Sequence, residues 1–227
     1  MRIIVQKFGG TSVATPEARA AVVKKVKEAM DKGYRSIIVA SAMGRKGDPY
    51  ATDTLIGLLK DQNPEATKRE LDALMCCGEL ISCSVLAGVL QKSGIKALVL
   101  TGGQAGIITD NTYGSARIMR VDTENLLDLI RDGFTPVVCG FQGVTEDNLN
   151  FTTIGRGGSD TTAAALGAAL AANLVEIYTD VEGIMTTDPR IVPDAQVLDT
   201  ISYGEICQLA HQGAKVIHPR AVEIVMQ

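Results

Sequence analysis

The chain has 227 residues, and 46% of them are hydrophobic, which suffices for one large domain or two closely joined lobes with a sizeable core. Its 22 basic and 26 acidic residues give a formal net charge of −4, and only 4% of the residues are aromatic. Nucleic-acid binding requires a basic face or a platform of aromatic rings, so we expect no nucleic-acid partner.

Strand-like and helix-like segments alternate through the first half of the chain. We predict strands at residues 3–7, 36–41, 96–101 and 135–140, and a turn between strands at 145–150. A first helix is expected to begin at Thr15-Pro16-Glu17, where an N-cap, an early proline and an acidic residue occur together, and to end at Gly33. Further helices are predicted from Asn63-Pro64-Glu65 to about Lys92, with an interruption at Gly78, and at 123–131.

The second half continues the same alternation. A glycine-rich run at residues 155–158 is followed by a predicted helix from about Asp160, a strand at 175–179, and helices at 203–212 and from Pro219 onward. Alternating strands and helices predict an α/β fold, a three-layer α/β/α sandwich with a largely parallel central sheet.

Neither a membrane span nor a metal centre is predicted. The apolar run that begins at Ile3 is too short for a signal peptide, and the apolar stretch at 161–172 has the length of a core helix. The five cysteines form no C-x-x-C pair, which favours buried thiols in a reducing compartment. Together with two histidines they show no zinc spacing, so we expect no metal ligands in the protein and a cytoplasmic location.

Three polar loops follow predicted strands and could hold phosphate. Lys7-Phe8-Gly9-Gly10-Thr11-Ser12 combines a lysine, two glycines that allow close backbone approach, and two hydroxyls, although a tight turn with a solvated lysine remains an alternative. Gly155-Arg156-Gly157-Gly158-Ser159-Asp160 precedes a helix, and its arginine suits a carboxylate; an ordinary capped helix is the alternative. Thr179-Asp180 and Thr186–Arg190 are equally compatible with a plain turn.

Other nucleotide-binding signatures are missing from the sequence. It contains no G-x-x-x-x-G-K-[ST], no G-x-G-x-x-G after the first strand and no H-R-D, which argues against a P-loop, a dinucleotide fold and a protein kinase.

Six motifs, in order over nearly the whole chain, resemble those of aspartokinases: KFGGTS (7–12), SAMG (41–44), GRGGSDTTA (155–163), YTDVEGI (178–184), TTDPR (186–190) and GAKVIHPRA (213–221). Aspartokinases are one branch of the amino-acid kinase superfamily, beside acetylglutamate, glutamate and uridylate kinases. The resemblance implies transfer of the γ-phosphoryl group of ATP, with Mg²⁺, to the side-chain carboxylate of L-aspartate. The product would be 4-phospho-L-aspartate, in the first step of lysine, threonine and methionine biosynthesis.

The resemblance also implies roles for individual residues. Lys7 and Asp160 would be catalytic, with Lys7 neutralising the transferring group and Asp160 organising the lysines. Aspartate would be bound by Thr52, Glu79, Arg156, Gly157, Gly158 and Ser159, with Glu79 on its ammonium group and Arg156 on a carboxylate. ATP would be bound by Lys7, Phe8, Gly9, Gly10, Ser41, Thr179, Asp180, Met185, Arg190 and Lys215. A carboxylate nucleophile is already ionised at pH 7, so no general base is needed.

Domain organisation follows from the same resemblance. Residues 1–150 would form an amino-acid-binding lobe and 151–227 a nucleotide-binding lobe, in a homo-oligomer. Met185 stands where the family has an aromatic residue, and the ACT regulatory modules that usually follow the kinase domain are expected to be absent from this chain. Two alternatives remain open: a sibling kinase for another acidic substrate, and a catalytically silent domain that senses an amino acid or a nucleotide.

Overall fold

A five-stranded parallel sheet forms the centre of the molecule. The computed structural model describes residues 1–147, 149–181, 183–188, 190–211 and 219–226. The strands of this sheet are β1 (Arg2–Phe8), β2 (Tyr34–Ala40), β3 (Ala97–Leu100), β6 (Thr135–Cys139) and β9 (Leu174–Tyr178). They lie in the order β3-β6-β2-β1-β9, and each neighbouring pair is parallel. The four strands predicted in the first half and the strand near residue 175 are therefore confirmed.

A smaller mixed sheet lies beside the central one. Its order is β5-β4-β7-β8, with β4 (Ile107–Thr109), β5 (Ile118–Val121), β7 (Gln142–Thr145) and β8 (Phe151–Thr153). β7 and β8 pair antiparallel around the predicted turn at 145–150, which is confirmed. The sheet itself was not predicted.

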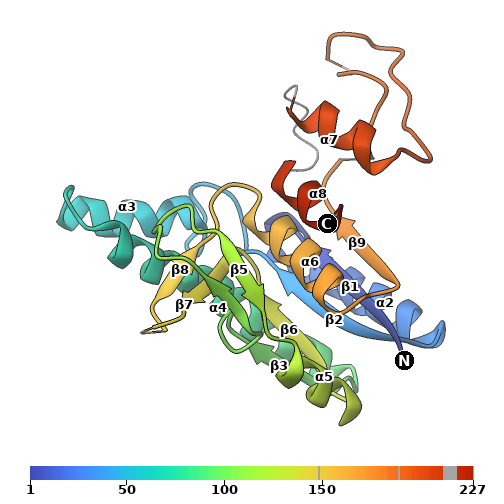
Figure 1. The fold of residues 1–227 in the computed structure, drawn as a ribbon, viewed down its shortest axis with the longest axis horizontal. Coiled ribbons are helices and arrows are strands. Elements are labelled where there is room, and N and C mark those ends of the chain that lie inside the picture. The colour runs from blue at the N-terminus through green and yellow to red at the C-terminus, as the bar shows by residue number, and fades with distance from the viewer. Residues whose placement is uncertain (148, 182, 189, 212–218, 227) are drawn as a thin grey trace.

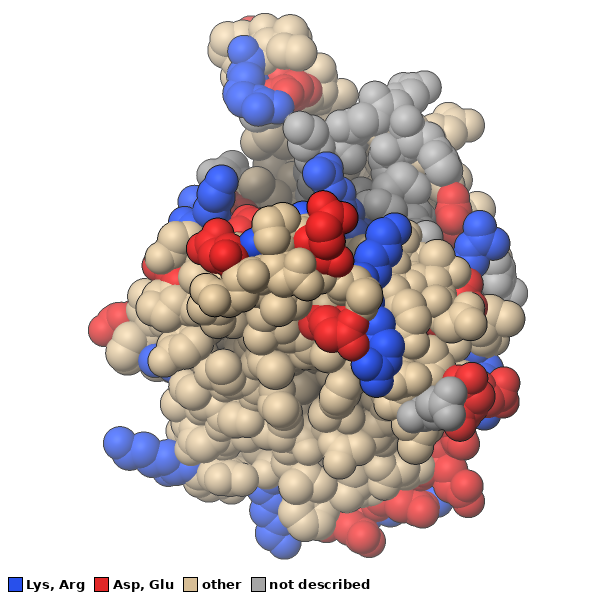
Figure 2. Space-filling model, turned by 90° about the vertical axis from the view of Figure 1, so that its left-hand side faces the viewer, with Lys and Arg blue, Asp and Glu red and all other residues tan. Residues whose placement is uncertain are grey.

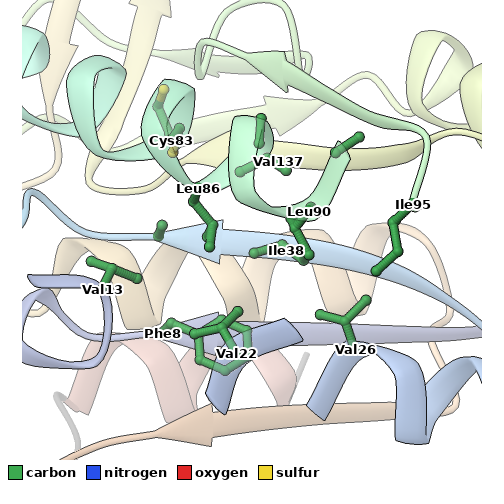
Figure 3. Close-up of a cluster of buried hydrophobic side chains, with 14 residues drawn as sticks. Phe8, Val13, Val22, Val26, Ile38, Cys83, Leu86, Leu90, Ile95 and Val137 are labelled. Atoms are coloured by element: carbon green, nitrogen blue, oxygen red, sulfur yellow. The ribbon is translucent and has the colours of Figure 1, made fainter. Parts of the chain in front are cut away.

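Helices cover both faces of the central sheet, which confirms the three-layer α/β/α prediction (Figure 1). On one face, α2 (Pro16–Asp31) and α4 (Lys68–Lys92) contribute Val22, Val26, Leu86 and Leu90 to a buried cluster (Figure 3). On the other face, α5 (Glu124–Arg131) and α6 (Gly158–Ala169) contribute to a second cluster through Leu126, Ile130, Ala163 and Leu166.

The two-residue period of the strands divides their side chains between these clusters. In β2, Ile38 lies in the α2/α4 cluster, whereas Ile37 and Val39 lie in the α5/α6 cluster. In β1, Val5 lies in the α5/α6 cluster. Lys7 is two residues further along the same strand, so the period directs it to the side on which α6 begins.

The predicted helix ending near Lys92 is confirmed as α4, but its predicted start at Asn63 is wrong. A separate helix, α3 (Thr52–Gln62), ends before Asn63, and α4 begins only at Lys68. Pro64 explains the break, because a residue that precedes proline is pushed out of the helical region, and Asn63 has φ −147° and ψ 98°. α4 also continues without interruption through Gly78, where a Cβ would lie 3.0 Å from the Cβ of Ala42, so glycine here permits close packing.

α4 is long and apolar enough to meet simple criteria for a membrane-spanning helix. It nevertheless contacts α3, β3, β6 and β8, and its buried face carries the carboxyl groups of Asp72 and Glu79. This packing is that of a core helix.

Three short helices complete the described fold. α1 (Gly10–Ala14) follows β1 directly, and α8 (Pro219–Val225) contacts α6. α7 (Tyr203–His211), together with the segment that follows β9, projects from the body of the molecule (Figure 1).

Candidate active site

A cavity of about 250 Å³ lies where β1, β2 and β6 end. Ligands of α/β proteins collect beyond the carboxyl ends of parallel strands, and this cavity has that position. Nine of the predicted site residues line it: Lys7, Ser41, Thr52, Glu79, Arg156, Gly157, Gly158, Ser159 and Asp160. The structure therefore brings both predicted catalytic residues and every residue predicted to bind aspartate into one place.

Lys7 and Asp160 form an ion pair at the base of the cavity. The Nζ atom of Lys7, near the end of β1, lies 2.7 Å from a carboxylate oxygen of Asp160 in the first turn of α6. The two side chains are only 11% and 16% exposed, so solvent screens the pair weakly. Asp160 thereby fixes the direction of the lysine, and the positive end of α6 lies close to both.

Glu79 presents a carboxyl group to the cavity from the buried face of α4. It is 2% exposed, and its Oε1 accepts a hydrogen bond of 3.1 Å from the backbone N–H of Ala42. Within the described residues, its Oε2 has no hydrogen-bond partner. Burial raises the pKa of Glu79 to about 8, because the anion loses hydration that one backbone hydrogen bond only partly replaces. A buried acceptor without a partner is costly unless a ligand supplies a donor.

The glycine-rich loop bends sharply around Arg156. Gly155 and Gly157 have φ values of +87° and +67°, in the left-handed region that glycine enters at low cost. A Cβ on Gly158 would lie 2.7 Å from the ring of Phe141, so the loop also needs glycine for contact with its neighbour. Arg156, between these glycines, is an exposed side chain at the cavity wall.

A hydrogen bond between two serines closes the cavity wall. The Oγ atoms of Ser41, directly after β2, and Ser159, at the start of α6, are 3.0 Å apart. This bond ties the SAMG loop to the N-terminus of α6.

Phe141 and Ala42 line the cavity but were not predicted. Phe141 has φ +68°, which is uncommon for a bulky residue and marks a strained backbone. Its N–H donates to the Oγ1 atom of Thr162 and its carbonyl accepts from Ile154, and these bonds hold it there. Its position just beyond the predicted strand at 135–140 was a usable signal, since that is where sheet ligands gather.

Three of the residues predicted to bind ATP, Phe8, Gly9 and Gly10, lie in the first glycine loop. The ring of Phe8 is 2% exposed and stacks on Tyr178 with centroids 4.7 Å apart, so its side chain belongs to the core. Because successive side chains of a strand point to opposite faces, Phe8 lies on the face of β1 opposite that of Lys7. The N–H of Gly9 donates to the carbonyl of Tyr178 at 3.3 Å. Gly10 opens α1, and its backbone packs against the SAMG loop.

The other predicted ATP residues are not among those lining the cavity. Asp180 forms an ion pair with Arg45. Arg190 is exposed and forms a two-point ion pair with Asp188. Met185 is half-buried in an isolated bridge to Val197, Thr179 follows β9, and Lys215 lies outside the described residues.

Comparison with known proteins gives a consistent result. Residues 2–227 match the sequence model of the amino acid kinase family. The chain is 53% identical over 227 residues to Aspartokinase 1 of Bacillus subtilis (strain 168), covering 100% of this chain and 56% of that protein. It is 50% identical over 223 residues to the aspartokinase of Geobacillus stearothermophilus, covering 98% of this chain and 53% of that one. The chain thus spans about half the length of the curated relatives it matches.

Solved structures show the same similarity. The aspartate kinase of Synechocystis superposes with a TM-score of 0.81 at 46% identity, covering 97% of this chain and 36% of that one. E. coli aspartokinase III, solved in complex with aspartate and ADP, superposes with a TM-score of 0.84 at 29% identity, covering 99% of this chain and 60% of that one.

Proposed function

Because the chain belongs to the amino acid kinase family, we propose that it transfers the γ-phosphoryl group of ATP to the side-chain carboxylate of L-aspartate. Its relatives named as aspartokinases support this choice of substrate within the family. The observation that carries the proposal is the cavity that contains Arg156, the Lys7–Asp160 pair and the buried Oε2 of Glu79, which has no hydrogen-bond partner among the described residues.

The cavity offers complementary groups for an amino acid with two carboxylates. Glu79 would accept hydrogen bonds from the ammonium group, which supplies the donors that its Oε2 lacks. Arg156 would bind a carboxylate through its planar guanidinium fork. Thr52, Ser159 and the backbone of Gly157 and Gly158 line the remaining wall.

Phosphoryl transfer requires alignment and positive charge more than covalent chemistry by the protein. Lys7 would stabilise the charge on the transferring group, and Asp160 would keep the lysine directed into the cavity. The acceptor carboxylate is ionised at pH 7, so it can attack without a general base.

Mg²⁺ would accompany ATP rather than occupy a cage built by the protein. The described residues contain no group of three or more His, Cys, Asp or Glu side chains that could hold a metal ion. A phosphate-bound Mg²⁺ needs few protein ligands, because the phosphates and water supply most of its oxygen ligands. The ion would offset the repulsion between ATP and the acceptor carboxylate.

We propose that the nucleotide lies next to the cavity, against α1 and the segment after β9. Gly10, Ser41, Thr179, Asp180, Met185, Arg190 and Lys215 are the proposed contacts, and Arg190 and Asp180 would exchange their present ion-pair partners on binding. The proposed division into an amino-acid-binding lobe at residues 1–150 and a nucleotide-binding lobe at 151–227 is not strict, because Arg156 to Ser159 line the amino-acid cavity and β1 and β9 share one sheet.

We also propose a cytoplasmic homo-oligomer. All five cysteines are free thiols, as expected in a reducing compartment. The outer face of α4 exposes a stripe of uncharged residues: Ala73, Cys77, Leu80, Ser84, Val85 and Gly88. On the face drawn in Figure 2, an area in the lower part carries no charged side chains, whereas charged side chains lie above it and along its edges. Uncharged surface of this kind favours self-association.

The test of the proposed function is ADP release in the presence of aspartate, glutamate or N-acetylglutamate. We expect turnover with aspartate, and none without an amino acid. Arg156→Lys should raise the KM for aspartate about tenfold, because lysine keeps the charge but loses the fork. Arg131→Lys, an exposed arginine on α5 paired with Asp128, is the matched control and should leave the KM unchanged. Preference for another acid would indicate a sibling kinase, and no turnover would indicate a silent binding domain.

A further inference from the structure

Asp72 is a second buried carboxylate of α4 that lies outside the cavity. It is fully buried, and its oxygens accept three hydrogen bonds. One oxygen accepts from the N–H of Gly114 at 2.9 Å and from the N–H of Thr153 at 2.9 Å, and the other accepts from the hydroxyl of Thr153 at 2.8 Å. Burial raises the pKa of this carboxyl group, and the hydrogen bonds oppose that rise. A buried carboxylate is expensive, so its partners indicate what it holds in place.

The partner that matters is Thr153, the last residue of β8. Its N–H and hydroxyl bind Asp72, and its carbonyl accepts from the N–H of Ala116 at 2.8 Å. The N–H of the next residue, Ile154, donates to the carbonyl of Phe141 at 2.8 Å. The backbone is thus fixed on both sides up to Gly155, the residue directly before Arg156.

The other partner, Gly114, supports the same loop. A Cβ on Gly155 would lie 3.4 Å from the carbonyl oxygen of Gly114 and 3.5 Å from the Oγ atom of Ser115. Asp72 therefore holds the glycine-rich loop directly through Thr153 and laterally through the segment at 114–115.

The same helix carries Glu79. Asp72 and Glu79 are both on the buried face of α4, two turns apart, or about 10 Å at a rise of ~1.5 Å per residue. One rigid helix thus holds a cavity carboxyl group directly and the arginine-bearing loop through Asp72.

We infer that Asp72 is a positioning residue that fixes the separation between Glu79 and Arg156, and thereby the fit of the amino-acid substrate, by tethering Thr153 to α4. The inference rests on the proposed function for the identity of the substrate. The nucleotide should be little affected, because neither Asp72 nor Thr153 adjoins the segment after β9.

Three variants separate positioning from general stability. Asp72→Ala removes the tether. Asp72→Asn can keep it, since the amide oxygen can accept both N–H groups while the amide nitrogen donates to the hydroxyl of Thr153. Thr153→Val removes one bond at nearly constant shape and serves where Asp72→Ala fails to fold. Thr67→Ala is the matched control, because it removes the N-cap of the same end of α4 and leaves the tether intact.

The measurements are the KM for aspartate, the KM for ATP and amide hydrogen exchange at residues 153–158. Asp72→Ala should raise the KM for aspartate about tenfold or more, and Thr153→Val about threefold, with the KM for ATP within twofold of wild type. Exchange at 153–158 should accelerate in both. Asp72→Asn and Thr67→Ala should resemble wild type in all three measurements.

Two results would overturn the inference. One is an equal rise of both KM values in Asp72→Ala or Thr153→Val, and the other is unchanged exchange at 153–158. A wild-type protein without aspartate-dependent turnover would refute the proposed function instead, and the exchange data would still decide whether Asp72 tethers the loop.

Discussion

At the scale of single residues, the cavity keeps the carboxyl group of Glu79 protonated at a pH at which it would be ionised in water. Glu79 is buried beside one backbone N–H, and its pKa is raised to about 8 by desolvation. In the empty cavity at pH 7 the protonated form therefore predominates. An incoming ammonium group would have to displace that proton, so substrate binding and proton release are coupled.

The affinity for aspartate should consequently depend on pH. At pH values below the Glu79 pKa of about 8, only a minority of the molecules carry an ionised Glu79. The KM for aspartate should therefore fall by more than about tenfold between pH 6 and pH 8, and level off above pH 8. Glu79→Gln keeps the acceptor for Ala42 but cannot ionise, so its KM should be high and independent of pH in this range. Steady-state kinetics across the range checks this, and a wild-type KM that is flat with pH would contradict it.

The same residue should affect the stability of the unliganded protein. Its pKa is raised on folding from about 4.5 to about 8, so the folded state binds more protons than the unfolded state. The contribution of Glu79 to the free energy of unfolding is fully present below the unfolded pKa of about 4.5. It is lost as the pH rises toward and through the folded pKa of about 8. Thermal melts between pH 5 and pH 8.5 should show a falling Tm for wild type and a smaller fall for Glu79→Gln. Parallel curves for the two proteins would argue against the shifted pKa.

At the scale of elements, the first glycine loop and the SAMG loop are packed backbone to backbone. A Cβ on Gly10 would lie 2.5 Å from the carbonyl oxygen of Ala42 and 3.0 Å from that of Gly44. Gly44 also donates a hydrogen bond of 3.2 Å to the carbonyl of Gly10. Because backbone atoms cannot move aside as a flexible side chain can, the two loops can approach only with glycine at this position.

Gly10→Ala should therefore separate the loops, lower the Tm by several degrees and reduce turnover more than about tenfold. The matched control is Gly57→Ala, in the interior of α3, where a new Cβ meets nothing within 4 Å. Alanine is the better helix former by roughly 0.5–1 kcal/mol, so this control should raise the Tm slightly and leave turnover unchanged. A Gly10→Ala protein as stable and active as wild type would show that the two loops can adjust.

The elements that the sequence predicted are those with a strong local signal. The apolar run of β1 and the helical spacing of Val22 and Val26 in α2 each specify a buried face. Asn63-Pro64 was misread because a proline occurs both in the first turn of a helix and just after a helix ends. The strands of the small sheet have only three or four residues each, too few for an alternating pattern.

The candidate site was predictable to a similar extent. Lys7, Ser41 and Arg156 adjoin predicted strands or helices, and the ends of parallel strands meet at one edge of a sheet. The burial of the Phe8 side chain was not predicted, because motif position alone does not reveal which face of a strand a side chain takes. Asp72 depends on contacts between segments distant in the chain, which no local pattern encodes.

At the scale of the whole molecule, the outer face of α4 provides a test of self-association. Leu80, 41% exposed, lies in the middle of this uncharged stripe. Leu80→Glu should shift an oligomer toward monomer in light scattering, because a charge at an apolar contact must be desolvated. Met119→Glu, at a more exposed residue on β5, is the control and should leave the mass unchanged. A wild-type protein that is monomeric at all concentrations would contradict this interface.

The position of β1 in the central sheet has a consequence for biosynthesis. β1 is synthesised before both of its neighbours, β2 and β9, and Ile4 pairs with Leu174. At about 5–20 residues per second, β9 is synthesised roughly 7–28 seconds after β2. During that interval one edge of β1 is unpaired, which is a site for wrong strand pairing. Lys7 also lacks Asp160 until residue 160 has been synthesised, so the cavity cannot be completed before then.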